Sequence, residues 1–104
     1  MPFALDDVRL ARHLKALAHP ARLTIMRALM GADRCSCGEI VRTLPLAQSP
    51  VSQHLKVLRE AGLIRGEIEG PRSCYWVDGV ALAEVVAAVD GLAAPAPRRR
   101  AGAA

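Results

Sequence analysis

Aromatic residues are scarce in this chain of 104 residues, which contains one Phe, one Tyr and one Trp. Its core must therefore be built from Leu, Val, Ile and Ala, and in a chain of this length such a core is often completed by dimerisation. Long apolar runs are also missing, so neither a signal peptide nor a membrane-spanning helix is predicted. We therefore expect a single small cytoplasmic domain that has no membrane partner.

Cysteines and catalytic motifs are equally sparse. The cysteines are Cys35, Cys37 and Cys74, and in a reducing cytoplasm two thiols this close in sequence favour metal binding or redox chemistry over a structural disulfide. The sequence has no phosphate-binding loop, no nucleophile elbow and no paired carboxylates. We therefore expect neither enzymatic activity nor an organic cofactor.

The net charge of +4 favours polyanionic partners. The positive excess lies mainly in residues 1–34, which hold six basic and three acidic residues. Composition alone therefore does not establish nucleic-acid binding. The order of the predicted helices and strands is the stronger indication of whether the chain binds DNA.

Helical spacing of apolar residues accounts for most of the chain. It predicts helices within residues 5–20, 19–30 and 38–44. Pro20 suits the first position of the second helix, and Gly31 ends it. In the first helix Val8, Ala11, Leu14 and Leu17 lie at helical spacing, and in the second helix Leu23, Met26 and Leu29 are predicted to form the buried stripe.

The clearest helix follows within residues 47–63. Ser49 is predicted to cap its start, Pro50 to take its first position and Gly62 to end it. One side of this helix is apolar and the other is polar. The apolar side consists of Val51, Leu55 and Leu58, and the polar side of Ser52, Gln53, Lys56 and Arg59.

A hairpin and a last helix complete the pattern. Two runs rich in β-forming residues flank Gly70 and Pro71, which predicts a hairpin within residues 63–78. The last helix, within residues 78–92, is capped by Asp78 and carries a wide apolar stripe. The members of this stripe are Leu82, Val85, Val86, Val89 and Leu92.

A short helix, a turn marked by proline and a longer helix with a polar outer side make a helix-turn-helix, to which the hairpin adds a wing. We therefore predict a mainly α fold with a small β-hairpin: a dimeric winged helix-turn-helix of about five helices. This domain is predicted to cover residues 1–94. Residues 95–104, rich in Pro, Ala and Arg, are predicted to form a disordered tail.

The chain resembles the ArsR/SmtB family of winged helix-turn-helix repressors over roughly residues 13–78. The segments that carry the resemblance are "HPARLTIMRAL", "GEIVRTLPLAQSPVSQHLKVLREAGLIRGEIEGPR" and "CYWVD". The resemblance implies a homodimer that binds an imperfect inverted repeat in double-stranded DNA and releases it when a metal, metalloid or thiol-reactive signal is sensed. It also implies that the first and last helices form the dimer interface, a role that the stripe of the last helix fits.

A helix of this kind fits the major groove, where base edges present a readable pattern of donors and acceptors. Gln53 suits a bidentate contact to adenine, whereas Lys56 and Arg59 suit phosphates. Glu67 and Glu69 near the hairpin tip would repel phosphates. Arg72 is therefore the best candidate for a contact between the wing and DNA. The predicted DNA-binding residues are Gln48, Ser49, Ser52, Gln53, His54, Lys56, Arg59 and Arg72.

The histidines allow simpler interpretations. His54 adjoins the apolar side of its helix, so it is either a packed, hydrogen-bonded histidine or a reader of bases. His13 and His19 are interpreted as structural residues.

The cysteine pair resembles the "CVC" motif of arsenical repressors. On an extended segment, residues two apart face the same way. If the stretch before the third helix pairs with the returning strand of the wing, Cys35 and Cys37 lie near Cys74, with Cβ atoms about 5 Å apart. Three thiolates suit soft, thiophilic ions. We predict that these three cysteines bind As(III) or Sb(III) as inducer, since Zn or Cd would require a fourth ligand.

Two alternatives stay open for these thiols. They are suited to reversible oxidation, as in sensors of oxidants or sulfur species. Cysteine is also a small apolar residue that often only fills a core.

Overall fold

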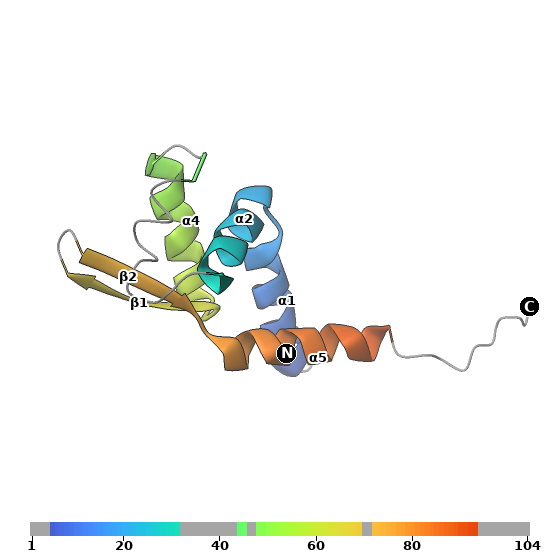
Figure 1. Cartoon of the computed structure of the whole chain (residues 1–104). Helices are drawn as coiled ribbons and strands as arrows, with labels where there is room; N and C mark the ends of the chain where they lie inside the picture. Colours follow the sequence, from blue (N-terminus) through green and yellow to red (C-terminus); the bar gives the residue numbers. More distant parts are fainter. Residues whose placement is uncertain (1–4, 32–43, 46–47, 70–71, 94–104) are drawn as a thin grey trace, which may run out of the picture.

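The computed structural model describes residues 5–31, 44–45, 48–69 and 72–93. The helices are α1 (Leu5–Leu17), α2 (Pro20–Met30), α4 (Gln48–Glu60) and α5 (Gly79–Leu92), and the strands are β1 (Ile64–Glu69) and β2 (Arg72–Val77). Figure 1 shows α5 running beneath α1 and α2, with α4 standing beside α2 and the hairpin projecting to one side.

The order of helices and hairpin is the predicted one. The predicted helix at residues 38–44 falls almost entirely outside the described residues, and so does the tail at 95–104. The third helix and the domain boundary at residue 94 therefore stay predictions.

Local sequence explains both ends of α2. His19 precedes the helix in an extended conformation, and its Nδ1 accepts a hydrogen bond of 3.0 Å from the backbone N–H of Ala21. Pro20 lies in the first turn, where a missing N–H costs no intrahelical bond. At the other end the N–H of Gly31 donates to the carbonyl of Arg27. The predicted bounds of α2 and the structural interpretation of His19 are confirmed.

The start of α4 differs from the prediction. The helix begins at Gln48, so Ser49 lies within the first turn and does not cap the helix. The helix starts two residues before Pro50, its predicted first position, so the predictions for Ser49 and Pro50 were both wrong by two residues. Pro50 remains compatible with this start, because the N–H groups of a first turn have no intrahelical acceptor.

The end of α4 is a Schellman motif at Gly62. The N–H of Leu63 donates to the carbonyl of Leu58 and that of Gly62 to the carbonyl of Arg59, both at 3.0 Å. Gly62 has a φ of 83°, in the left-handed region that glycine adopts without a steric cost. Leu58 and Leu63 are fully buried, so the motif fixes the direction in which the chain enters β1.

The hairpin forms as predicted. Strands β1 and β2 pair antiparallel, in a register that runs from Ile64 opposite Val77 to Glu69 opposite Arg72. The pairing therefore reaches both sides of the predicted two-residue turn.

Asp78 connects this wing to α5. Its Oδ1 accepts from the N–H of Ala81 at 3.0 Å, and its Oδ2 accepts from Nε of Arg65 at 2.9 Å. Its own N–H donates to the carbonyl of Leu63 at 2.9 Å. The N–H of Ala81 first, and then Arg65, hold the pKa of Asp78 below its ordinary value. The predicted cap of the last helix is confirmed.

The core is apolar, and no polar or charged side chain is buried among the described residues. On α2 the buried side includes Ile25, whereas Leu23 of the predicted stripe is 39% exposed. The predicted burial of Met26 and Leu29 is confirmed, and only that of Leu23 was wrong. Because α2 is apolar on more than one side, packing and not spacing selects the buried side. The buried residues are Ala16, Ile25, Met26, Leu29, Val51, Leu55, Leu58, Leu63, Ile64 and Val85.

The four apolar residues that indicated helix α1 lie largely outside the core. Val8, Ala11 and Leu14 are exposed, and of the four only Leu17 packs against the core. Ala16 is the buried residue of this helix. The helix thus turns one side to its own domain and leaves a second apolar side uncovered. No helix in the described ranges is long and apolar enough to cross a bilayer.

We predict that Gly62→Ala lowers the free energy of unfolding by about 1–2 kcal/mol, because a Cβ is disfavoured at positive φ. Gly91→Ala in α5 is the matched control. An added Cβ at Gly91 meets no atom within 4 Å, and alanine favours a helix, so stability should be unchanged or slightly raised. Urea unfolding followed by circular dichroism measures both, and equal effects of the two variants would contradict the prediction.

Candidate nucleic-acid interface

Helix α4 has two different sides. Val51, Leu55 and Leu58 are buried against the core, which confirms the predicted apolar side. The opposite side is exposed, and Figure 1 shows the N-terminal end of α4 at the edge of the molecule farthest from α5. The exposed residues of this side are Ser52, Gln53, Lys56, Arg59 and Glu60.

A cleft of about 420 Å³ lies between α4 and β2. From α4 it is lined by Ser52, Lys56 and Arg59, and from the wing by Tyr75, with Leu55 and Glu60 completing it. The two basic side chains and the two hydroxyl groups suit a phosphate of a nucleic-acid backbone, whereas the exposed carboxylate of Glu60 at the same cleft opposes one. Sequence analysis did not single out Tyr75, because only the hairpin register brings it beside α4.

Gly66 allows Tyr75 to take this position. The two residues are directly opposite in the hairpin register. A Cβ added at Gly66 would lie 2.6 Å from Cδ1 of Tyr75, a separation too short for any real contact. The missing side chain of Gly66 is therefore the space that the tyrosine ring fills.

His54 is half-buried on the side of α4 that faces the start of α2. Its Nδ1 accepts a hydrogen bond of 3.2 Å from Nε of Arg22. Its ring lies against that of His19, with centroids 4.5 Å apart and planes tilted by 50°. This geometry agrees with the packed, hydrogen-bonded interpretation of His54, while contact with DNA stays a prediction.

Other predicted site residues are only partly described. Gln48 and Ser49 belong to the first turn of α4, and Arg72 opens β2 opposite Glu69. The positions of their side chains are outside the described part of the structure.

The proposed thiol site is described at one position. Cys35 and Cys37 lie outside the described residues, whereas Cys74 is half-buried in β2, opposite Glu67, and packs against the core. No group of three His, Cys, Asp or Glu side chains suited to a metal ion occurs among the residues that the structure describes. The convergence of the three cysteines therefore stays a prediction.

Helix α5 carries the last predicted site. Val85 is buried and Leu82 packs against the core, so part of the stripe covers its own domain. The rest is exposed: 61% for Val86, 38% for Val89 and 77% for Leu92. Together with the uncovered side of α1, α5 therefore presents apolar surface that the single chain does not cover.

A mainly helical domain with an exposed polar helix beside an antiparallel hairpin belongs to the class of winged helix-turn-helix domains. Residues 17–67 match the family described as "Helix-turn-helix domain". The chain is 35% identical to the HTH-type transcriptional regulator YgaV of Escherichia coli, over 79% of this chain and 83% of that protein. It is 41% identical to the HTH-type transcriptional repressor SmtB of Mycobacterium tuberculosis, over 70% of this chain and 53% of that protein.

A solved structure agrees with these relatives. The homodimeric winged helix-turn-helix domain Mb0332 of Mycobacterium bovis, 26% identical, superposes with a TM-score of 0.63 over 90% of each chain. The present chain belongs to the ArsR/SmtB family of winged helix-turn-helix transcriptional regulators. It spans about half the length of the SmtB repressor.

Proposed function

We propose that this chain represses transcription by binding, as a homodimer, an imperfect inverted repeat in double-stranded DNA. The observation that carries the proposal is the two-sided character of α4. Its apolar side is buried in the core, while Ser52, Gln53 and Lys56 are exposed on the other side, at the edge of the molecule. A helix held in this way can enter the major groove with its polar side toward the bases.

The exposed residues of α4 divide into two roles. Gln53 has the amide that pairs with N6 and N7 of adenine, and Ser52, next to it, can reach bases or phosphates. Lys56 and Arg59 line the cleft with Tyr75, which suits a backbone phosphate on the side of the groove nearest the wing. We propose that Gln48 and Ser49, at the start of α4, and Arg72, at the start of β2, also contact the DNA.

Dimerisation follows from the exposed apolar side chains of α1 and α5. Val86 and Leu92 are mostly exposed in the single chain, which is costly for apolar groups and is relieved when a second copy covers them. The relative Mb0332 is homodimeric. In a symmetric dimer two copies of α4 read two half-sites about 34 Å apart, one turn of the duplex.

We predict different effects for two variants of α4 on binding to a duplex that the wild-type chain selects from a random library. Gln53→Ala should weaken binding to that duplex by about 1–3 kcal/mol and leave binding to random duplex unchanged. Lys56→Ala should weaken both and reduce the slope of log K against log salt by about 1 per protomer.

Arg9→Ala is the charge-matched control, since Arg9 pairs with Glu84 on exposed α1 and α5 surface and not with α4. Fluorescence anisotropy over a range of salt concentrations gives both quantities. A wild-type chain that does not distinguish the selected duplex from random duplex would contradict the proposed function.

We predict that Val86→Glu shifts the chain from dimer to monomer and weakens dimerisation at least about 100-fold, because each subunit would bury an unpaired carboxylate. Ala87→Glu adds the same charge on the opposite side of α5, where it should leave the dimer intact. Sedimentation equilibrium measures both. If the two variants dissociate alike, or neither does, the apolar side of α5 is not the interface.

We propose further that Cys35, Cys37 and Cys74 bind a thiophilic ion, with As(III) or Sb(III) as the inducer that releases DNA. Support comes from the chemistry of the donor set, since three thiolates match the soft, three-coordinate preference of these ions. Cys74 lies in β2 one residue before Tyr75, so a ligand there would act on the strand that borders the cleft. A ligand shifts the equilibrium only by its difference in affinity between the two shapes.

We predict that arsenite or antimonite releases the wild-type chain from its selected duplex, and that Cys35→Ser and Cys37→Ser abolish this release without weakening DNA binding in the absence of the ion. Cys74→Ser should do the same if the site has three thiolates. Anisotropy titrations with each ion and, separately, with hydrogen peroxide distinguish the ligand from thiol oxidation. If all three variants still dissociate on arsenite, the cysteine site is contradicted.

A further inference from the structure

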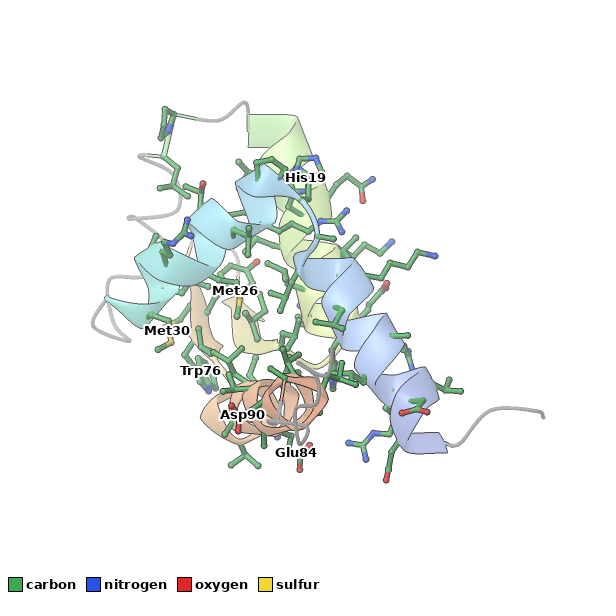
Figure 2. All side chains as sticks on the ribbon, turned by 90° about the vertical axis from the view of Figure 1, so that its right-hand side faces the viewer. His19, Met26, Met30, Trp76, Glu84 and Asp90 are labelled. Atoms are coloured by element: carbon green, nitrogen blue, oxygen red, sulfur yellow. The ribbon has the colours of Figure 1, made fainter. Side chains whose placement is uncertain are left out.

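One side chain joins three elements near the start of α2. Nη1 of Arg22 donates to the carbonyl of Ala16 in the last turn of α1, at 3.3 Å, and its Nε donates to Nδ1 of His54 in α4, at 3.2 Å. Figure 2 shows His19 at this end of α2, beside α4, and Met26 farther along between the packed elements. Arg22 thus forms a polar link from α2 to both neighbouring helices, beside a core in which the buried residues are apolar.

Both imidazoles at this link use Nδ1 as an acceptor. Nδ1 of His19 accepts from the N–H of Ala21, and Nδ1 of His54 accepts from Arg22. An imidazole accepts a hydrogen bond at Nδ1 only when that nitrogen carries no proton. The hydrogen bond from Arg22 therefore requires His54 to be neutral.

The surroundings of His54 oppose a positive charge on it. From α2 it faces Arg22 and His19. The last turn of α1, which packs on both α2 and α4, carries Lys15 and no acidic residue. Within α4 the residues one turn away from His54 are Pro50, Val51, Val57 and Leu58, which do not titrate.

We propose that Arg22 and His54 are positioning residues: their hydrogen bond holds α4 in the orientation that reads DNA, and protonation of His54 breaks it. Sequence-specific binding then requires neutral His54. This inference rests on the proposed function of α4. Ser52 and Gln53 immediately precede His54 in the helix, so a displacement of His54 from Arg22 also displaces the residues that face the bases.

The direction of the pH effect follows from the environment. Burial first, and then the electrostatic effects of the neighbouring His19 and Arg22, lower the pKa of His54 below its ordinary value of 6.5. His54 is thus neutral at pH 7, and between the lowered pKa and 6.5 the unfolded chain binds more protons than the folded one. The contribution of neutral His54 to the stability of the folded chain is complete above pH 6.5 and is lost as the pH falls through the lowered pKa.

The test compares binding to the selected duplex and to random duplex between about pH 7.5 and about pH 5, the range in which imidazoles titrate, at constant ionic strength. For the wild-type chain the ratio of the two affinities should fall with decreasing pH, approaching tenfold per pH unit for each subunit, and therefore about 100-fold for the dimer, below the pKa of His54. Binding to random duplex should not fall, since it depends on total positive charge.

His54→Gln keeps an acceptor for Arg22 but cannot be protonated, so its preference for the selected duplex should persist at low pH. His13→Gln is the matched control: His13 is half-buried in α1 beside α5, and its loss should leave the pH dependence unchanged. Proton NMR of the imidazoles in the wild-type chain should give a His54 titration midpoint equal to that of the affinity ratio, which needs no variant.

The experiment distinguishes failure of the proposed function from failure of the inference about His54. Absence of any preference at pH 7.5 contradicts the proposed function and with it the inference. A preference at pH 7.5 that persists or grows at low pH contradicts the inference alone, because His54 would then act as a cationic DNA contact.

Discussion

The burial of one side of α4 is the constraint on which the other features depend. Leu58 is completely buried and Val51 and Leu55 nearly so, and each such side chain contributes about 1.5–3 kcal/mol when it leaves water. Rotating α4 by half a turn would expose all three and bury Gln53 and Lys56 without partners. The same packing that stabilises the domain therefore determines which residues face outward.

The position of α4 is also connected to the positions of the wing and of α5. The Schellman motif at Gly62 directs the chain into β1, and Asp78 joins the end of β2 to the start of α5 by three hydrogen bonds. Helix α4, the hairpin and α5 thus form one connected unit. If α5 forms the dimer interface, its distance from α4 within the subunit sets the separation of the two copies of α4, and therefore the spacing of half-sites that a dimer can bind.

The sequence predicted the features that depend on local chemistry. Pro20, Gly62 and Asp78 mark helix ends because of their own backbone or side-chain properties, and the two-sided pattern of α4 is unambiguous. The stripe of α2 was wrong at Leu23, because a helix apolar on several sides does not define its own buried side. The link between Arg22 and His54 joins residues 32 positions apart, and the periodicity of a sequence does not indicate such a contact.

Apolar burial and polar contacts play different parts in holding α4. Hydrophobic attraction is proportional to area and has no direction, so an apolar surface alone permits small rotations and slides of one helix over another. A hydrogen bond fails when its atoms move by a fraction of an ångström. Since Arg22 contacts both α1 and α4, it selects one orientation of α4 among those that the apolar core allows. Base recognition by Gln53 requires α4 to be held in one such orientation.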